Sequence, residues 1–146
     1  MFIDEQQVKE VTNLDFLELL KAARDAELEI TAELEQIERL HRIMRNTGHS
    51  LAYAQTLADN LAKFEEELNA NIDRAVDAKR EALKVLSALH GDERAVLYQH
   101  YILAKDWRKI SDEMFISERQ VFNLRKKALD SLNRHYKCVD ICEVAL

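Results

Sequence analysis

The sequence predicts an all-α protein, with a long antiparallel helical hairpin of coiled-coil type followed by a smaller helical domain. The 146-residue chain contains no Pro and only two Gly, and 33% of its residues are charged, so few positions break a helix. Apolar residues recur at three- and four-residue steps through most of the chain, as on one face of a helix. The two Gly fall at the two main boundaries that we infer. We therefore divide the chain into residues 1–90 and 91–146.

The first predicted helix covers residues 4–46, with Asp4 as its N-cap residue. Its second half carries an apolar stripe at the spacing of a coiled-coil seam, formed by Ile30, Leu34, Ile37, Leu40 and Met44. Gly48 suits the left-handed conformation that ends many helices, and Ser50 suits the N-cap of the next helix. These residues predict a turn near residues 46–50.

The second predicted helix runs to about residue 90 and also carries an apolar stripe. The stripe consists of Leu57, Leu61, Phe64, Leu68, Ile72, Ala75, Lys79, Leu83 and Leu86. The expected hairpin buries Leu34, Ile37, Leu61, Phe64 and Leu68. Because two helices bury only one seam, we expect the hairpin to associate with a second copy of the chain or with another protein. Gly91 is expected to end the helix, and Asp92 to cap the next one.

Residues 106–132, DWRKISDEMFISERQVFNLRKKALDSL, predict two helices joined by a tight turn. Asp106 can cap the first helix, and Ser117 with Gln120 forms an S-x-x-Q capping box for the second. Ile116 and Val121 have the spacing of a hydrophobic staple around the same helix start. The short connection predicts a helix-turn-helix. Apolar residues of the preceding segment are expected to pack onto it, namely Val96, Leu97, Tyr101 and Leu103.

The second of these helices has an apolar face and a polar face. The expected core face consists of Val121, Leu124, Ala128 and Leu132, and the opposite face of Arg119, Asn123, Lys126 and Asp130, with Gln120 and Lys127 beside them. Arg and Asn can read base edges in a DNA groove, and Lys neutralises phosphates. A solvated helix face is the alternative interpretation; the short turn, the capping box and the polarised helix together favour DNA. The candidate DNA-binding residues are Arg108, Lys109, Ser117, Glu118, Arg119, Gln120, Phe122, Asn123, Lys126 and Lys127.

The charge distribution agrees with this position of the site. The chain has a net charge of −6, which by itself disfavours nucleic acid. Residues 1–104 have a net charge of −8, residues 105–137 of +4 and residues 138–146 of −2. Positive charge is therefore concentrated in the candidate DNA-binding segment, whereas the acidic remainder suits a protein partner.

From Leu89 to Leu132 the chain resembles the C-terminal helix-turn-helix region of bacterial sigma factors, region four. The matching residues are Glu93-Arg94-Ala95-Val96-Leu97, Ile110, Ser117, Val121, Ala128-Leu129 and Leu132. The chain departs from that pattern with Phe115 in place of a frequent Gly, Ser111 in place of a frequent Ala, and Phe122 in place of a frequent Arg.

With its long helical N-terminal part, the chain also resembles phage late-gene regulators of the RinA and ArpU type. This resemblance implies a sequence-specific DNA-binding transcriptional regulator, acting as a late-gene activator in the cytoplasm of a bacterial host cell. The implied partners are double-stranded DNA, RNA polymerase and further copies of the chain bound through the hairpin. Arg119, Gln120 and Asn123 would face bases, and Arg108, Lys109, Lys126 and Lys127 would face phosphates. Phe122 is expected to pack against the helix that begins near Asp92, with contact to a thymine methyl group as the alternative.

Two other functions remain open. A small terminase subunit also combines a helix-turn-helix with a helical oligomerisation region, although its helix-turn-helix usually comes first. The third possibility is a protein that binds RNA polymerase or a sigma factor without DNA, and the net charge of −6 is its best support.

No pattern in the sequence points to catalysis, a cofactor or a metal. His135, Cys138 and Cys142 could share one side of a helix as zinc ligands, but reduced cytosolic thiols are the favoured interpretation. Trp107 is expected in the core of its short helix. No apolar run approaches the ~20 residues of a membrane span, and the start of the chain lacks a signal-peptide pattern, so we expect a cytosolic protein. The tail, residues 136–146, could extend the last helix or dock on a partner.

Overall fold

The protein is all-helical, as the sequence predicts. The computed structural model describes the backbone of residues 5–46 and 48–144, and the side chains of residues 16–46 and 48–136. The described chain contains no strand. Its elements are α1 (Glu5–Arg45), α2 (Leu51–Leu86), α3 (Gly91–Leu97), the π-helical turn η1 (Tyr98–Ile102), α4 (Trp107–Met114) and α5 (Glu118–Val144). Asp4, the expected first N-cap, lies outside the described residues.

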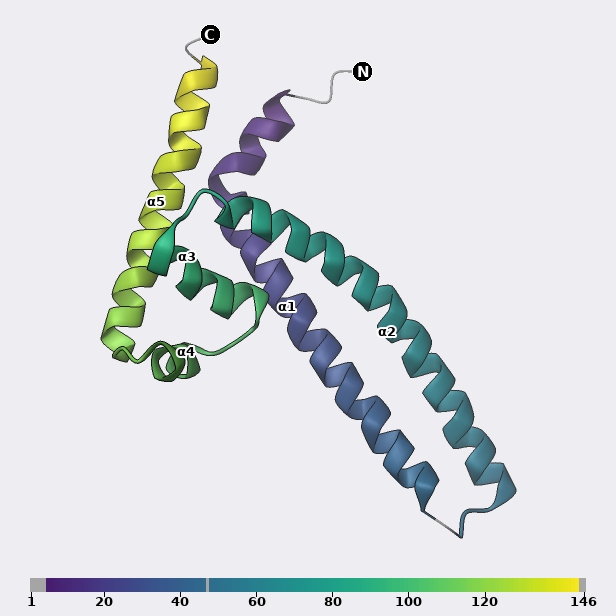
Figure 1. Cartoon of the computed structure of the whole chain (residues 1–146). Coiled ribbons are helices and arrows are strands. Elements are labelled where there is room, and N and C mark those ends of the chain that lie inside the picture. The colour runs from purple at the N-terminus through teal and green to yellow at the C-terminus, as the bar shows by residue number, and fades with distance from the viewer. Residues whose placement is uncertain (1–4, 47, 145–146) are drawn as a thin grey trace.

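Helices α1 and α2 form a long antiparallel hairpin, and the shorter elements gather at the end of it that lies away from its turn (Figure 1). With 41 residues, α1 is about 60 Å long. In the turn, Gly48 has a φ of +99°, and the Ser50 hydroxyl accepts a bond from the Tyr53 N–H at 3.1 Å. The expected N-cap at Ser50 is therefore confirmed.

The seam between α1 and α2 follows the predicted stripes only in part. Ile37 is buried, and Leu61, Phe64 and Leu68 are half-buried, whereas Leu34 and Met44 of the expected seam are exposed. On α2, Asn71 lies in the seam with 7% of its surface exposed, and Ile72 is 39% exposed. The Asn71 amide donates to the Glu33 carboxylate of α1. Because α1 and α2 share a single seam, an apolar residue next to it in sequence, such as Ile72, stays at the surface.

The main core joins the hairpin to the C-terminal helices. Its buried residues are Phe16, Leu20, Ala23, Ala82, Val85, Leu86, Leu89, Leu97, Tyr101, Ile102, Ala128 and Leu132. The Phe16 ring of α1 also stacks on the Tyr136 ring of α5 at 5.6 Å. The segments on either side of residue 90 thus share one core, which fixes α5 on the end of the hairpin.

The boundary between α2 and α3 differs from the expected one. Helix α2 ends at Leu86, earlier than Gly91, because Leu89 turns into the core and takes the chain out of the helix. Gly91 is the first residue of α3, with a φ of +60°, and the N-cap residue is His90, which makes no side-chain capping bond. Asp92 is instead in the first turn of α3, where its charge suits the positive end of the helix dipole.

The packing of α3 and η1 also departs from expectation at one residue. Val96, Leu97 and Tyr101 are buried as expected, but Leu103 is 45% exposed. In η1 the hydrogen bonds span five residues, as from the Leu103 N–H to the Tyr98 carbonyl at 3.2 Å, so successive side chains turn by less than in an α-helix. Ile102 therefore faces the core in place of Leu103.

Candidate functional site

Helix α4 begins where the sequence places it. The Asp106 carboxylate accepts a bond from the Lys109 N–H at 2.8 Å, so the expected N-cap is confirmed. Ile110 is fully buried, and Ser111 is also buried, with its hydroxyl donating to the Arg108 carbonyl at 2.7 Å. That bond inside the helix explains how a hydroxyl replaces the small apolar residue that is frequent at position 111.

The turn after α4 places an aromatic residue in a left-handed conformation. Phe115 has φ 58° and ψ 38°, and its side chain is 94% exposed. Its N–H bonds to the Asp112 carbonyl at 3.4 Å, and the Ile116 N–H bonds to the Ser111 carbonyl at 3.1 Å. This pair of bonds is a Schellman motif, in which Gly usually occupies the left-handed position. The turn is thus closed without Gly, at the cost of local strain.

Helix α5 starts with the predicted capping box. The Gln120 N–H donates to the Ser117 hydroxyl at 3.1 Å, and the Ser117 N–H donates to the Gln120 side-chain oxygen at 3.1 Å. Ile116 and Val121, the predicted staple, both belong to a second apolar cluster. Backbone and side-chain bonds therefore fix the first turn of α5 against α4.

The buried face of α5 connects the site to both clusters. Val121, Ala128 and Leu132 are fully buried, and Leu124 is half-buried, as the sequence predicts. Val121 packs with Val96 of α3 and Ile110 of α4 in the second cluster, whereas Ala128 and Leu132 belong to the main core. The opposite face of α5 is held outward as a consequence.

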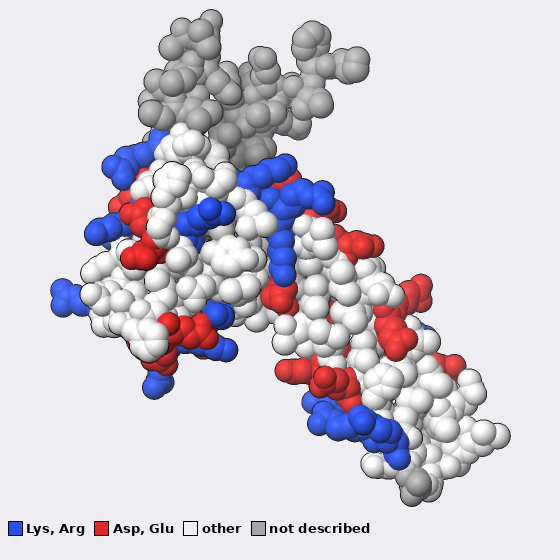
Figure 2. All heavy atoms as spheres, viewed as in Figure 1, with Lys and Arg blue, Asp and Glu red and all other residues white. Residues whose placement is uncertain are grey.

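The structure brings the predicted site residues together on the outer surface of α4 and α5. All ten are exposed, namely Arg108, Lys109, Ser117, Glu118, Arg119, Gln120, Phe122, Asn123, Lys126 and Lys127. Five of these ten residues are Lys or Arg, and none of the five has a described carboxylate within ion-pair distance. Figure 2 shows Lys and Arg in separate groups interspersed with Asp and Glu, including around α4. This surface therefore offers unpaired positive charge together with the Asn123 amide.

Phe122 has an aromatic neighbour on α4. Its ring lies 5.9 Å from that of Trp107, so it packs beside that helix. Phe122 follows the buried Val121 by one position, which turns its side chain about 100° toward α4. With 43% of its surface exposed, it remains part of the outer face.

Trp107 is the centre of an aromatic cluster that the sequence does not reveal. It is half-buried, with the His100 ring stacked on it at 3.7 Å and the Arg125 guanidinium 5.3 Å from its ring centre. The Arg125 interaction is a cation–π contact that fixes the side of α5 next to the site. The sequence hints at this cluster only through the i, i+3 spacing of Phe122 and Arg125, which places both side chains on one side of a helix.

The stacked His100 is held neutral. Burial lowers its pKa from 6.5 to about 4, and the nearby Arg24 and Arg125 act in the same direction. Its Nδ1–H donates to the Lys105 carbonyl at 2.8 Å, since a carbonyl can only accept. This bond ties η1 to the segment that leads into α4.

The described residues contain no group of three or more His, Cys, Asp or Glu that could hold a metal. Cys138 and Cys142 lie on α5, but their side chains are outside the described set, as are those of the remaining tail. The backbone of α5 continues to Val144, so the last helix includes that part of the tail. No described helix has the length and apolarity to cross a bilayer.

No protein-family model, curated protein sequence or solved structure matches the chain. The resemblance to sigma factor region four and to phage regulators therefore stays an expectation from the sequence.

Proposed function

We propose that the protein is a sequence-specific DNA-binding transcriptional regulator, with α4 and α5 as a sigma-like helix-turn-helix. The observation that carries the proposal is the outer face of α5. It presents Arg119 and Lys126, which have no ion-pair partner among the described residues, and the exposed Asn123 amide, on a helix fixed at its start and along its back. A rigid helix with free donors at these spacings suits the major groove.

The exposed residues divide into two roles. Arg119 and Asn123 are one turn apart and face outward, so they are placed for contacts with base edges. The Gln120 oxygen is used in the capping box, which leaves its NH₂ group as a donor. The list of phosphate-binding candidates is Arg108, Lys109, Lys126 and Lys127. By the resemblance, the regulated genes are phage late genes in the cytoplasm of a bacterial cell.

A second function is favoured by a specific observation. Phe115, in the turn after α4, and Phe122, in the first turns of α5, are two exposed aromatic residues, and aromatic residues are enriched at the centres of protein interfaces. With a net charge of −6, the chain also suits a protein partner better than non-specific DNA. RNA polymerase or a sigma factor, bound with or without DNA, is the corresponding partner.

Selection of genomic fragments by the full chain, followed by measurement of Kd on the selected site, tests the proposal. Arg119→Ala should weaken specific binding by about 5- to 150-fold, which corresponds to ~1–3 kcal/mol, and should relax sequence preference. Arg39→Ala is the matched control, since Arg39 is an exposed Arg on α1 of the hairpin. If the chain enriches no genomic fragment but retains RNA polymerase in a pull-down, the protein-binding function replaces the DNA-binding one.

A further inference from the structure

One side of the hairpin carries apolar side chains that nothing in the described structure covers. On α2 these are Ile72, Val76 and Leu83, with 39%, 50% and 39% of their surfaces exposed. A shallow groove of about 630 Å³ lies along this side, and its lining residues are Val76, Lys79, Arg80, Leu83, Lys84 and Ser87. We call Ile72, Val76, Lys79 and Leu83 the outer strip of α2.

The outer strip continues onto α1. The Glu27 carboxylate and the Lys79 amine form an ion pair at 2.5 Å, which shows that both face the same side of the hairpin. Leu34 follows Glu27 by seven residues, and Ile72 precedes Lys79 by seven, so both lie two turns further toward the hairpin turn. Leu34, which is 47% exposed, and Ile72 therefore share one side of the hairpin.

The spacing of the outer strip is symmetrical. Its residues are separated by four, three and four positions, which is the spacing of a coiled-coil seam. Ile72 and Leu83 are equally far from the point midway between residues 77 and 78, and so are Val76 and Lys79. When two such helices pair antiparallel about a two-fold axis at that point, Ile72 of each copy meets Leu83 of the other.

Charge along the hairpin also changes sign about this point. Toward the hairpin turn, residues 27–38 of α1 contain five Glu and no Lys or Arg, and residues 65–73 of α2 contain three Glu and one Asp and no Lys or Arg. On the other side, residues 79–84 contain two Lys and one Arg against one Glu. In the antiparallel register about this point, residues 79–84 of one copy lie opposite residues 71–76 of the other, whose acidic residue is Asp73 and whose basic residue is Arg74.

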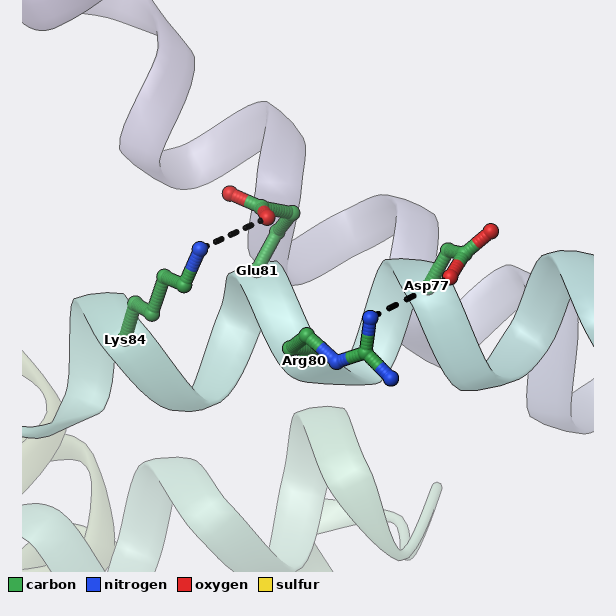
Figure 3. Close-up of polar contacts among 4 residues, drawn as sticks. All are labelled: Asp77, Arg80, Glu81 and Lys84. Atoms are coloured by element: carbon green, nitrogen blue, oxygen red, sulfur yellow. Dashed lines mark hydrogen bonds and ion pairs between the residues drawn. The ribbon is translucent and has the colours of Figure 1, made fainter.

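Arg80 and Asp73 are the flanking residues best placed for such a contact. They are seven residues apart, so they lie on the same side of α2, next to the outer strip. Figure 3 shows Arg80 paired with Asp77 on its own helix, at 3.7 Å, and Lys84 paired with Glu81. Both members of the Arg80–Asp77 pair are mostly exposed, so the pair is weak and Arg80 is free to change partner.

We propose that the outer strip of α2 binds a second copy of the same chain, as an antiparallel two-fold pairing in which Arg80 of each copy contacts Asp73 of the other. The strip has exposed apolar side chains, with Arg80 and Asp73 beside it, and a two-fold interface is self-complementary because the same patch serves both copies. This pairing gives a surface and a register to the association expected of the hairpin, and it does not depend on DNA binding.

Sedimentation equilibrium of the full chain without DNA, over a concentration series, tests the pairing. The parent should form a dimer, and Leu83→Glu should raise its dissociation constant by at least about tenfold, because the change occurs twice in the interface. Leu28→Glu is the matched control. Leu28 is 41% exposed, but it follows Glu27 by one residue, so it points away from the strip, and its variant should dimerise like the parent.

A charge exchange tests the register. Arg80→Asp and Asp73→Arg should each weaken the dimer by about fivefold, and the double variant should regain most of the loss. Circular dichroism checks that each variant keeps the helical content of the parent. A parent that stays monomeric throughout the series, a ring of more than two copies, or a double variant weaker than both single ones would overturn the proposal. Arg119→Ala should leave the dimer unchanged, so failure of DNA binding and failure of dimerisation are distinguishable.

Discussion

The capping box of α5 gives a stability prediction that tests how the site is fixed. Ser117→Ala removes the hydroxyl that accepts the Gln120 N–H at 3.1 Å, and it loosens the return bond from the Ser117 N–H to the Gln120 side chain. Loss of a Ser N-cap costs ~1 kcal/mol. Because Val121 in the same turn is fully buried in the second cluster, fraying at this end disturbs packing and should lower global stability. For a chain of this length the melting temperature should fall by roughly 4 °C.

A second N-cap in the chain provides the comparison. Ser50 caps α2 with one bond, to the Tyr53 N–H at 3.1 Å, at the far end of the hairpin where Leu51 is 86% exposed. Ser50→Ala should therefore cause local fraying and a smaller change in the midpoint of urea unfolding than Ser117→Ala. If Ser117→Ala leaves the midpoint unchanged, or if Ser50→Ala costs as much, the capping box does not fix α5.

Three further variants test the packing and electrostatics around the site. Phe115→Gly removes left-handed strain at a residue that is 94% exposed, so unfolding free energy should rise or change by less than about 1 kcal/mol; a larger loss would show that Phe115 packs. Ile110→Ala, at a fully buried residue, should cost about 2–5 kcal/mol in the same urea experiment, and a cost below 1 would contradict the assigned core. Because His100 is neutral in the folded chain, the free energy of unfolding should decrease as the pH is lowered from about 6.5 to about 4. In that range the unfolded chain binds a proton at His100, whereas the folded chain binds it only near pH 4. In the His100→Gln variant this loss of unfolding free energy should be smaller by about 1–2 kcal/mol, a figure reduced because His100 is partly exposed to solvent. An unchanged dependence of stability on pH would refute the argument from burial.

Local signals in the sequence predicted the helix starts well. The caps at Ser50, Asp106 and Ser117 depend on residues within one turn, and all three are confirmed by bonds between side chain and backbone. The buried face of α5 was also predictable, because Val121, Ala128 and Leu132 recur at helical spacing. Such features depend on short-range geometry that the sequence states directly.

Features that depend on the packing of distant segments were not predictable. Asn71 replaced Ile72 in the seam because Glu33, 38 positions away, supplies a partner for its amide. The end of α2 was misplaced because Leu89 turns into a core shared with α1 and α5. The position of Phe122 beside Trp107 likewise required the crossing of α4 over α5, which spacing alone does not give.

The salt dependence of DNA binding tests the central proposal most directly. Kd for a random-sequence duplex should be measured by fluorescence anisotropy across a salt series, for the parent and for Lys127→Ala, in which an exposed cation without an ion-pair partner among the described residues is removed. If the outer face of α5 binds the phosphate backbone, the variant should bind more weakly and its log–log salt slope should be lower by roughly one. Binding by the parent with no salt dependence, or a Lys127→Ala slope equal to that of the parent, would contradict the proposal.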